Sequence, residues 1–547
     1  MSSAGLLKLI TSGLQDERLL PPKGQPLPFT QTPAKAGRFT TEQYRVDFDN
    51  RPAFGTTAKA TLPRRGHIIT KAYLVTTLPD IKTPQLQARA ACDASGVAFA
   101  GPTFGWTNSI GHALVQSASV TIGANSIDTI DQKLFEILDE FHTPLEKMTV
   151  VNRLLGRYDN GFKPGKNGLT SPDSQQTVVT PLPFWFNRGD PSAALPIDAI
   201  GTDSVQISIT FNAFNNLWVS TSRSVNSDGQ QTMPALLGSP FYYINNASGT
   251  SVKGLNGNPD VATNVSLVPG ITMPAALPLI DAYLLLEYVY IDGPEANRIR
   301  LADINTPIVN HYTITPFITN RATQARITMR IPNPTRDLYI MIHRNDADLL
   351  NAPFLATRDL SGLFVADASG VGPIAPWWPD ASGLELTTAQ LRPLIPAFTE
   401  TDSEPITSLA LIYEGRLVRF ATDAPAYYRS ILPSFEKRKT PWVNKYVYHL
   451  PFGTQSEAFG ITNPMGHANL DKIQTLELAL TFKPFRGSLR STDVPNYTVY
   501  VYAETYNVLK VYGGRAGLLF NYGQTANALP VTVPTRPALS SDVPGCN

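Results

Sequence analysis

The residues best suited to chemistry are scattered along this chain. Seven histidines are spread over 547 residues, and the two cysteines lie far apart, at Cys92 and Cys546. The chain has no GxxxxGK[ST] phosphate loop, no HExxH zinc motif, no GxSxG nucleophile turn and no paired CxxC motif. We therefore expect no catalytic residues, no metal and no cofactor, and a protein that is not an enzyme. Two cysteines are too few for a disulfide framework, which favours a reducing compartment.

Charged clusters are few. Asp139 and Glu140 lie on a predicted helix without a partner pattern for acid–base catalysis, and we interpret them as a solvated helix face. The tightest basic cluster is Lys437-Arg438-Lys439, which we interpret as a solvent-facing loop, because nucleic-acid binding needs many cations along one surface. The net charge is only +1, so we expect no direct sequence-specific nucleic-acid binding.

Two kinds of recognition motif occur. Arg188-Gly189-Asp190 spells a tripeptide that some cell-adhesion receptors bind, but it follows a predicted strand and we interpret it as a turn. Sequons mark Asn246, Asn264 and Asn496 as candidate glycosylation sites. The N-terminus lacks the features of a secretory signal, so these sequons matter only if the chain meets glycosylation machinery.

The elements that must position these residues are mostly short strands. Alternating apolar and polar residues predict strands at 44–48, 58–62, 68–78, 118–122, 127–130, 177–186 and 204–211, and then at 283–291, 311–317, 325–331, 338–343, 408–413, 447–450, 475–482 and 498–506. The best predicted helix is Gln132–His142, which Pro144 ends. With 46 prolines, 38 glycines and 16% charged residues, the composition is typical of a loop-rich all-β protein with much surface for protein contacts.

The strands fall into two blocks of about eight, which predicts two tandem eight-stranded jelly-roll β-sandwiches with long loop insertions and few short helices. We divide the chain into an N-terminal arm (1–40), a first jelly roll (41–220), a linker and loop insertion (221–280), a second jelly roll (281–520) and a C-terminal tail (521–547). The apolar run Tyr283–Ile291 is expected to open the second roll and to be buried on both faces. A short helix is predicted after it, at Glu295–Arg300.

The arm carries an apolar stripe. Four residues recur at helical spacing: Leu6, Leu7, Ile10 and Leu14. Prolines follow from Pro21 to Pro33 and forbid regular structure there. The arm is either a flexible terminus or a segment that orders against a neighbour.

Six stretches follow one another in an order that resembles a viral family. They are 5–16 (GLLKLITSGLQD), 54–70 with PRRGHIIT at its end, 106–128 beginning WTNSIGHA, 182–196 (LPFWFNRGDPSAALP), 284–298, and 503–519 (AETYNVLKVYGGRAGLL). Together they resemble the major capsid proteins of the nucleocytoplasmic large DNA viruses, a double jelly-roll family. Against that family, 221–280 and 345–401 look like insertions.

The resemblance implies a structural major capsid protein. Such a chain homotrimerises into pseudo-hexagonal capsomers that tile the facets of an icosahedral capsid. The implied partners are other copies of itself, neighbouring capsomers, minor capsid or cement proteins and penton proteins. The arm, through Leu6, Leu7, Ile10 and Leu14, would contact minor capsid proteins or internal membrane proteins. The expected location is the virion, after assembly in the host cytoplasm.

Trp377 and Trp378 stand between two prolines in the 345–401 loop. Given the resemblance, we expect this preorganised aromatic pair to anchor a contact between subunits. Three alternatives stay open: a minor capsid or scaffolding double jelly roll, a sugar-binding or receptor-attachment β-sandwich protein, and a carbohydrate-active β-sandwich enzyme, which would need paired carboxylates in a cleft.

Overall fold

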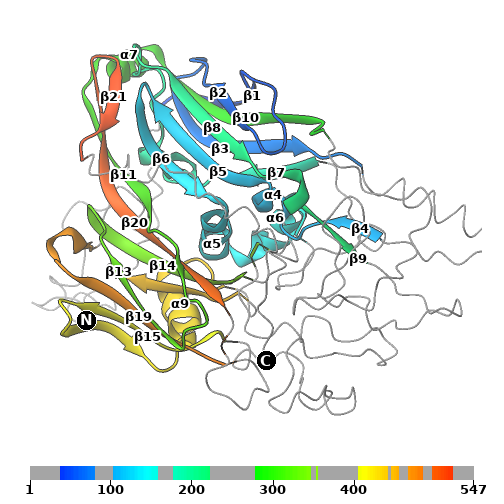
Figure 1. Cartoon of the computed structure of the whole chain (residues 1–547). Helices are drawn as coiled ribbons and strands as arrows, with labels where there is room; N and C mark the ends of the chain where they lie inside the picture. Colours follow the sequence, from blue (N-terminus) through cyan, green and yellow to red (C-terminus); the bar gives the residue numbers. More distant parts are fainter. Residues whose placement is uncertain are drawn as a thin grey trace, which may run out of the picture.

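The computed structural model describes residues 37–80, 103–157, 177–221, 278–345, 353–354, 404–441, 445–454, 466–484, 494 and 496–520. In these residues the strands pair into antiparallel ladders and the helices are short, which confirms the predicted all-β class. Two β-sandwiches lie one above the other, and a long strand of the lower sandwich runs up beside the upper one (Figure 1). We call them roll 1 and roll 2.

Roll 1 consists of two four-stranded sheets. Sheet 1A is ordered β1 (Phe39–Asp47), β10 (Asp281–Ile291), β3 (Ile68–Thr77), β7 (Thr177–Pro181). Sheet 1B is ordered β2 (Thr57–Thr61), β8 (Val205–Phe211), β5 (Val115–Ile122), β6 (Asn125–Asp131). A separate ladder joins β4 (Thr103–Trp106) to β9 (Trp218–Thr221). When the eight sandwich strands are counted along the chain, the first, eighth, third and sixth form sheet 1A, and the second, seventh, fourth and fifth form sheet 1B.

Roll 2 repeats this order. Sheet 2A is β11 (Ile304–Thr313), β20 (Tyr497–Tyr512), β14 (Pro334–Arg344), β17 (Val447–Pro451). Sheet 2B is β13 (Gln324–Met329), β19 (Leu476–Phe482), β15 (Ile406–Tyr413), β16 (Leu417–Thr422). Three short strands extend sheet 2A: β12 (Phe317–Ile318), β18 (Ala468–Asn469) and β21 (Arg515–Leu518). Both rolls are therefore jelly rolls of identical strand order, and each of the eight sandwich strands of one has an equivalent in the other.

The prediction that the strand at Tyr283–Ile291 opens the second roll is wrong. This strand, β10, pairs with β1 from Phe39–Ile291 to Asp47–Tyr283, and on its other side with β3. Its burial alternates, so only one of its faces is fully buried. Residues 221–280 accordingly precede the last strand of roll 1 and do not separate the two rolls. Strand partners are set by tertiary pairing, which a strand's position along the chain does not reveal.

The transition to roll 2 comes after β10. The predicted short helix is present as α7 (Gly293–Leu301), with Pro294 in its first turn and Asp292 as its N-cap. Both residues suit a helix start. Roll 2 begins with β11, at Ile304.

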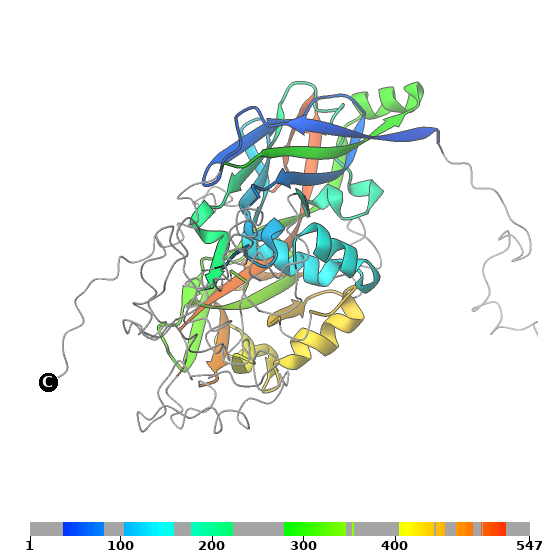
Figure 2. The ribbon, with the colours of Figure 1, turned by 90° about the vertical axis from the view of Figure 1, so that its right-hand side faces the viewer.

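The connection between the fifth and sixth strands is helical in both rolls. In roll 1 it contains α5 (Gln132–His142), with the predicted bounds, and α6 (Met148–Leu154). The Asp131 side chain caps α5 by accepting a hydrogen bond from the Leu134 amide at 2.9 Å. In roll 2 the same connection contains η11 (Tyr427–Ile431) and α9 (Leu432–Glu436). Figure 2 shows the two helical connections on the same side of the molecule, cyan above yellow.

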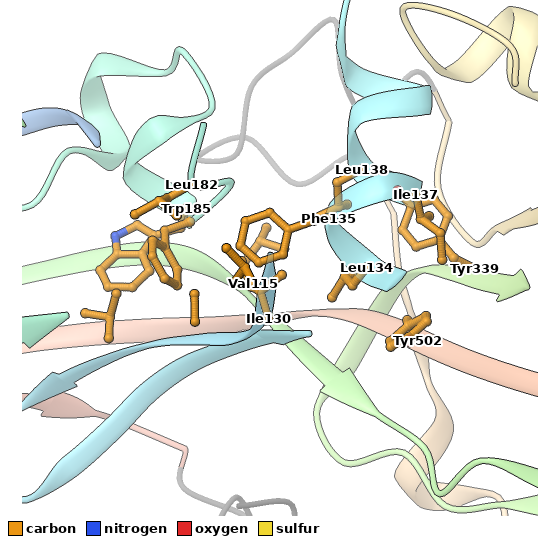
Figure 3. Packing of buried hydrophobic residues seen from close by; sticks show 14 of the residues in the cluster. Val115, Ile130, Leu134, Phe135, Ile137, Leu138, Leu182, Trp185, Tyr339 and Tyr502 are labelled. Carbon is orange, nitrogen blue, oxygen red and sulfur yellow. The ribbon is translucent and has the colours of Figure 1, made fainter. Parts of the chain in front are cut away.

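Helix α5 lies between the two rolls. Figure 3 shows Phe135 pointing towards Val115 of roll 1, and Ile137 towards Tyr339 of roll 2. These four side chains are fully buried in one apolar cluster that continues through both sandwiches. At about 1.5–3 kcal/mol for each large apolar side chain buried, such packing contributes substantially to holding the rolls together.

Candidate functional site: the junction between the rolls

Helix α5 carries three carboxylates into the junction. Glu136, Asp139 and Glu140 are spaced so that they share one side of the helix. The side chains of Glu136 and Glu140 are buried, and that of Asp139 is nearly so. Buried carboxylates are costly unless cations face them at close range.

Roll 1 supplies one of these cations. Arg157, which follows α6, donates from Nη2 to Glu136 Oε2 at 2.6 Å and from Nη1 to Asp139 Oδ2 at 2.8 Å. Its Nε donates to the hydroxyl of Ser109 at 2.8 Å. His112 completes the local network, with Nδ1 lying 2.6 Å from Glu136 Oε2. Arg157 is therefore fixed by several partners, all from its own sandwich.

Roll 2 supplies two further cations. Lys445 donates from Nζ to Glu140 Oε1 at 2.8 Å and also to Glu136. Lys439 places Nζ 3.3 Å from Glu140 Oε2. Three cations thus face three carboxylates, and Lys445 joins the rolls across more than 300 residues of sequence. We call this set, with His112, the α5 ion cluster.

Two interpretations from the sequence are wrong here. Asp139 and Glu140 do not form a solvated helix face, and Lys437 and Lys439 are buried. The physical reason is that their partners lie far away along the chain. Asp139 pairs with Arg157 and Lys437 with Asp337 within their own rolls, whereas Lys439 meets Glu140 of the other sandwich. A local pattern shows none of these partners. One signal in the sequence could have indicated this contact: the carboxylates of α5 and the basic cluster Lys437-Arg438-Lys439 have opposite charges.

The charges shift the pKa values of the carboxylates. Burial alone would raise the pKa of Glu136, but Arg157 and Lys445 outweigh burial and hold this pKa well below its usual range. The pKa of Asp139 is lowered because Arg157 outweighs its burial. That of Glu140 is lowered because Lys445 and Lys439 do the same. The three carboxylates are therefore ionised in the folded protein at neutral pH.

A second polar contact lies on the outer face of sheet 2A. Asp128 in β6 of roll 1 accepts a hydrogen bond from the backbone amide of His311 at 3.0 Å, and its other oxygen lies 3.0 Å from the His311 ring. Arg188 of roll 1 pairs with Glu504 of β20 at 2.6 Å. Arg188 thus makes a buried ion pair, and Gly189 has a φ of 86°, so the Arg188-Gly189-Asp190 tripeptide forms the predicted bend.

Lys437 and the aromatic ring of Phe141 also lie against the outer face of sheet 2A. Lys437 donates to Asp337 Oδ2 at 2.8 Å, and His449 Nε2 lies 2.8 Å from Oδ1. Burial alone would raise the pKa of Asp337, but Lys437 and His449 lower it to about 2. Phe141 of α5 packs on Tyr339 with ring centroids 5.3 Å apart.

The tip of the β20–β21 hairpin reaches back to roll 1. The carbonyl of Gly514 accepts a hydrogen bond from the Thr202 amide at 2.8 Å. Gly514 has a φ of 79°, and a Cβ there would lie 2.8 Å from Thr202 Oγ1. Only glycine fits this approach without strain.

Most of the site residues predicted from the sequence lie outside the described residues. These are Leu6, Leu7, Ile10, Leu14, Trp377, Trp378, Asn246 and Asn264. Asn496 is described and half-buried, and its sequon partner Thr498 donates its hydroxyl to Asn345 at 2.6 Å. Glycosylation at Asn496 stays a prediction.

Within the described ranges, no cluster of three or more His, Cys, Asp or Glu side chains could hold a metal ion. The helices of the same ranges include none that is long and apolar enough to span a bilayer. The polar groups of the junction are instead engaged with one another. This arrangement fixes the orientation of one sandwich against the other. Moving the sandwiches apart would leave a buried charge without its partner, which is strongly unfavourable.

The fold and the junction define a double jelly-roll protein, and comparisons with known proteins agree. Two family models match the chain: the major capsid protein N-terminus over residues 28–246, and the large eukaryotic DNA virus major capsid protein over residues 303–517. The chain belongs to the major capsid proteins of the large eukaryotic DNA viruses and is a capsid component.

Individual relatives are distant in sequence. The major capsid protein of Tipula iridescent virus is 21% identical over 498 residues, which cover 89% of this chain and 88% of that protein. Probable capsid protein 4 of Acanthamoeba polyphaga mimivirus is 24% identical over 346 residues, 54% of this chain and 63% of that protein, which is less than two thirds of its length. A quasi-atomic model of the PBCV-1 virus capsid has a similar fold, with a TM-score of 0.59 and 19% identity over 90% of this chain and 99% of that chain.

Proposed function

We propose that three copies of this chain assemble into a pseudo-hexagonal capsomer, and that such capsomers tile the facets of an icosahedral capsid. The observation that carries this proposal is the repeated strand order of the two rolls. One chain supplies two blocks of equal topology, so three chains supply six. The junction supports it further, since a tile needs its blocks in a fixed relation.

The proposal extends to partners. Minor capsid or cement proteins and penton proteins would bind the capsomer, and the arm with Leu6, Leu7, Ile10 and Leu14 would face the interior, towards minor capsid or internal membrane proteins. Trp377 and Trp378 are proposed as anchors between subunits. The chain has a structural role without enzymatic activity, and assembly takes place in the host cytoplasm.

Native mass spectrometry of the purified full chain tests the trimer. We expect one stable species of three chains, each of 59.6 kDa. A chain that stays monomeric at every concentration would overturn the proposed trimer.

Copy number separates the major role from a minor capsid or scaffolding role with the same fold. Quantitative proteomics of purified virions should place this chain among the most abundant proteins. A few copies per particle would assign it the minor role instead.

A further inference from the structure

The outer face of sheet 2A is covered within the chain. Tyr339, Tyr502 and Glu504 project from it and are fully buried. The cover comes from roll 1: Phe141 of α5 packs on Tyr339, Asp131 of β6 accepts a hydrogen bond from the Tyr502 hydroxyl at 2.7 Å, and Arg188 pairs with Glu504. The fifth strand of roll 1 and the helix that follows it thus form the main part of this cover.

The equivalent face of sheet 1A is only partly covered. On β10, Tyr283 and Leu285 point away from the core of roll 1, and Leu285 lies opposite Tyr73 of β3. These three side chains are half-buried and form an apolar strip across two central strands. The guanidinium of Arg45 lies 3.9 Å from the centre of the Tyr283 ring. The strip is bordered by charged pairs, Lys71 with Glu287 and Arg45 with Asp281, so it forms an apolar patch with a charged rim. An apolar centre with a polar rim is typical of a protein–protein contact surface.

The elements of roll 2 that are equivalent to β6 and α5 are β16 and the helical segment η11–α9, and both expose large apolar side chains. Strand β16 exposes Leu417 and Val418, at 63% and 49%. The helical segment η11–α9 exposes Tyr427, Ile431 and Phe435, at 41%, 55% and 73%.

Tyr427, Ile431 and Phe435 recur every four positions, so they form one exposed stripe along the helical segment η11–α9. The opposite side of that segment is buried in roll 2, where Arg429 donates to Glu404 Oε2 at 3.2 Å. The segment η11–α9 is therefore packed on roll 2 through one side and exposes the apolar stripe on the other.

We propose that β16, η11 and α9 of one copy dock on the outer face of sheet 1A of a second copy of this chain. The contact repeats between chains the one that β6 and α5 make with sheet 2A inside each chain. This docking proposal rests on the proposed capsomer and names the two surfaces through which its chains contact one another. Because the two surfaces differ, the contact is head-to-tail, and in the proposed trimer three such contacts close into a ring.

The chemistry of the two surfaces fits this occupant. Each presents large apolar side chains, and burying them against each other at about 25 cal/mol per Å² favours association. The equivalence of the strands also fits this contact. Strand β16 and the segment η11–α9 of roll 2 correspond to β6 and α5 of roll 1, and sheet 1A corresponds to sheet 2A. A second copy is the partner that carries both surfaces.

Cross-linking tests the pairing of these surfaces. In a full chain with Cys92→Ser and Cys546→Ser, the double variant Tyr283→Cys with Phe435→Cys should join up to three chains through a short thiol-specific linker. Each single variant should stay unlinked, because the same residue does not meet itself in a head-to-tail contact. Self-linking of the Phe435→Cys variant, or no linking of the double variant, would overturn the proposal.

A charge in the stripe provides the second test. Phe435→Asp should weaken association at least about tenfold per contact, as expected of a hot-spot residue, while the circular dichroism spectrum stays native. Leu301→Asp is the matched control, because Leu301 on α7 is 85% exposed and lies outside both surfaces. It should leave association unchanged.

The outcomes separate the two proposals. If the unmodified chain is trimeric and Phe435→Asp is equally trimeric, the docking surfaces are wrong and the capsomer stands. If the unmodified chain is monomeric, both are wrong.

Discussion

Sheets 1A and 2A share one strand order, yet their outer faces differ in chemistry. Sheet 2A presents Asp337, Glu504 and His311, which are buried and meet charged or polar partners. Sheet 1A presents the half-buried Tyr73, Tyr283 and Leu285, and its ion pairs, such as Lys71 with Glu287, lie at the rim in contact with solvent. A face covered by its own chain can use ion pairs, because folding places each partner every time. A face left for another copy favours apolar groups, whose removal from water needs no compensating charge.

The largest effect should follow from removing the cation that roll 1 places in the α5 ion cluster. Arg157→Met leaves Asp139 without its paired cation and Glu136 without one of its two, so we expect the free energy of unfolding to fall by about 3–5 kcal/mol. Urea unfolding followed by circular dichroism measures this. The control is Arg298→Met, because Arg298 is 80% exposed and lies 3.9 Å from Glu295. That change should cost under about 0.5 kcal/mol. Equal losses in the two variants would contradict the buried role of the cluster.

Acid should weaken the same cluster. The folded pKa values of Glu136, Asp139 and Glu140 lie below their ordinary values of 4.5, 3.8 and 4.5. Their contribution to stability is therefore complete above these ordinary values and is lost as the pH falls through the folded ones. Between about pH 5 and about pH 3 we expect a loss of roughly 2 kcal/mol or more in the free energy of unfolding.

The control for the acid effect is Glu136→Gln, which keeps the shape of the side chain and removes one titrating group. Its unfolding free energy should depend less steeply on pH, whatever its absolute stability. An unchanged slope would show that Glu136 does not take part.

The smallest effect concerns the hairpin that joins β20 to roll 1. Gly513 and Gly514 both have positive φ, at 57° and 79°, but only at Gly514 would a Cβ meet Thr202. Gly513→Ala should cost about 1 kcal/mol from backbone strain alone, and Gly514→Ala roughly 2 kcal/mol. Thermal unfolding of the two variants measures the difference. Equal costs would show that the hairpin tip does not press on roll 1.

Local sequence patterns predicted much of the fold. Gln132–His142 was predicted with its observed bounds, because its apolar period and Pro144 are local signals. Most sandwich strands were predicted for the same reason, with ends that differ by a few residues. Strand β16 was missed, and the strand predicted at 311–317 overlaps only the end of β11. The strand order that proves the two rolls equivalent needed the pairings, and β10 was assigned to the wrong roll because its partners β1 and β3 lie more than 200 residues away.

The junction was harder to predict. Glu140 and Lys445 are 305 residues apart, and each by itself has the pattern of a surface residue. Charge on a helix usually indicates solvent, and only the packing of α5 between two sandwiches reverses this. The family resemblance predicted two jelly rolls correctly, but it did not indicate which side chains hold them together.

Hydroxyl-radical footprinting of tyrosines tests the contrast between the two faces most directly. The full assembled chain is compared with the Phe435→Asp variant. We expect Tyr339 and Tyr502 on sheet 2A to be protected in both. Tyr73 and Tyr283 on sheet 1A should be protected in the assembled chain and labelled in the variant. Equal labelling of Tyr73 and Tyr283 in the two samples would contradict the account.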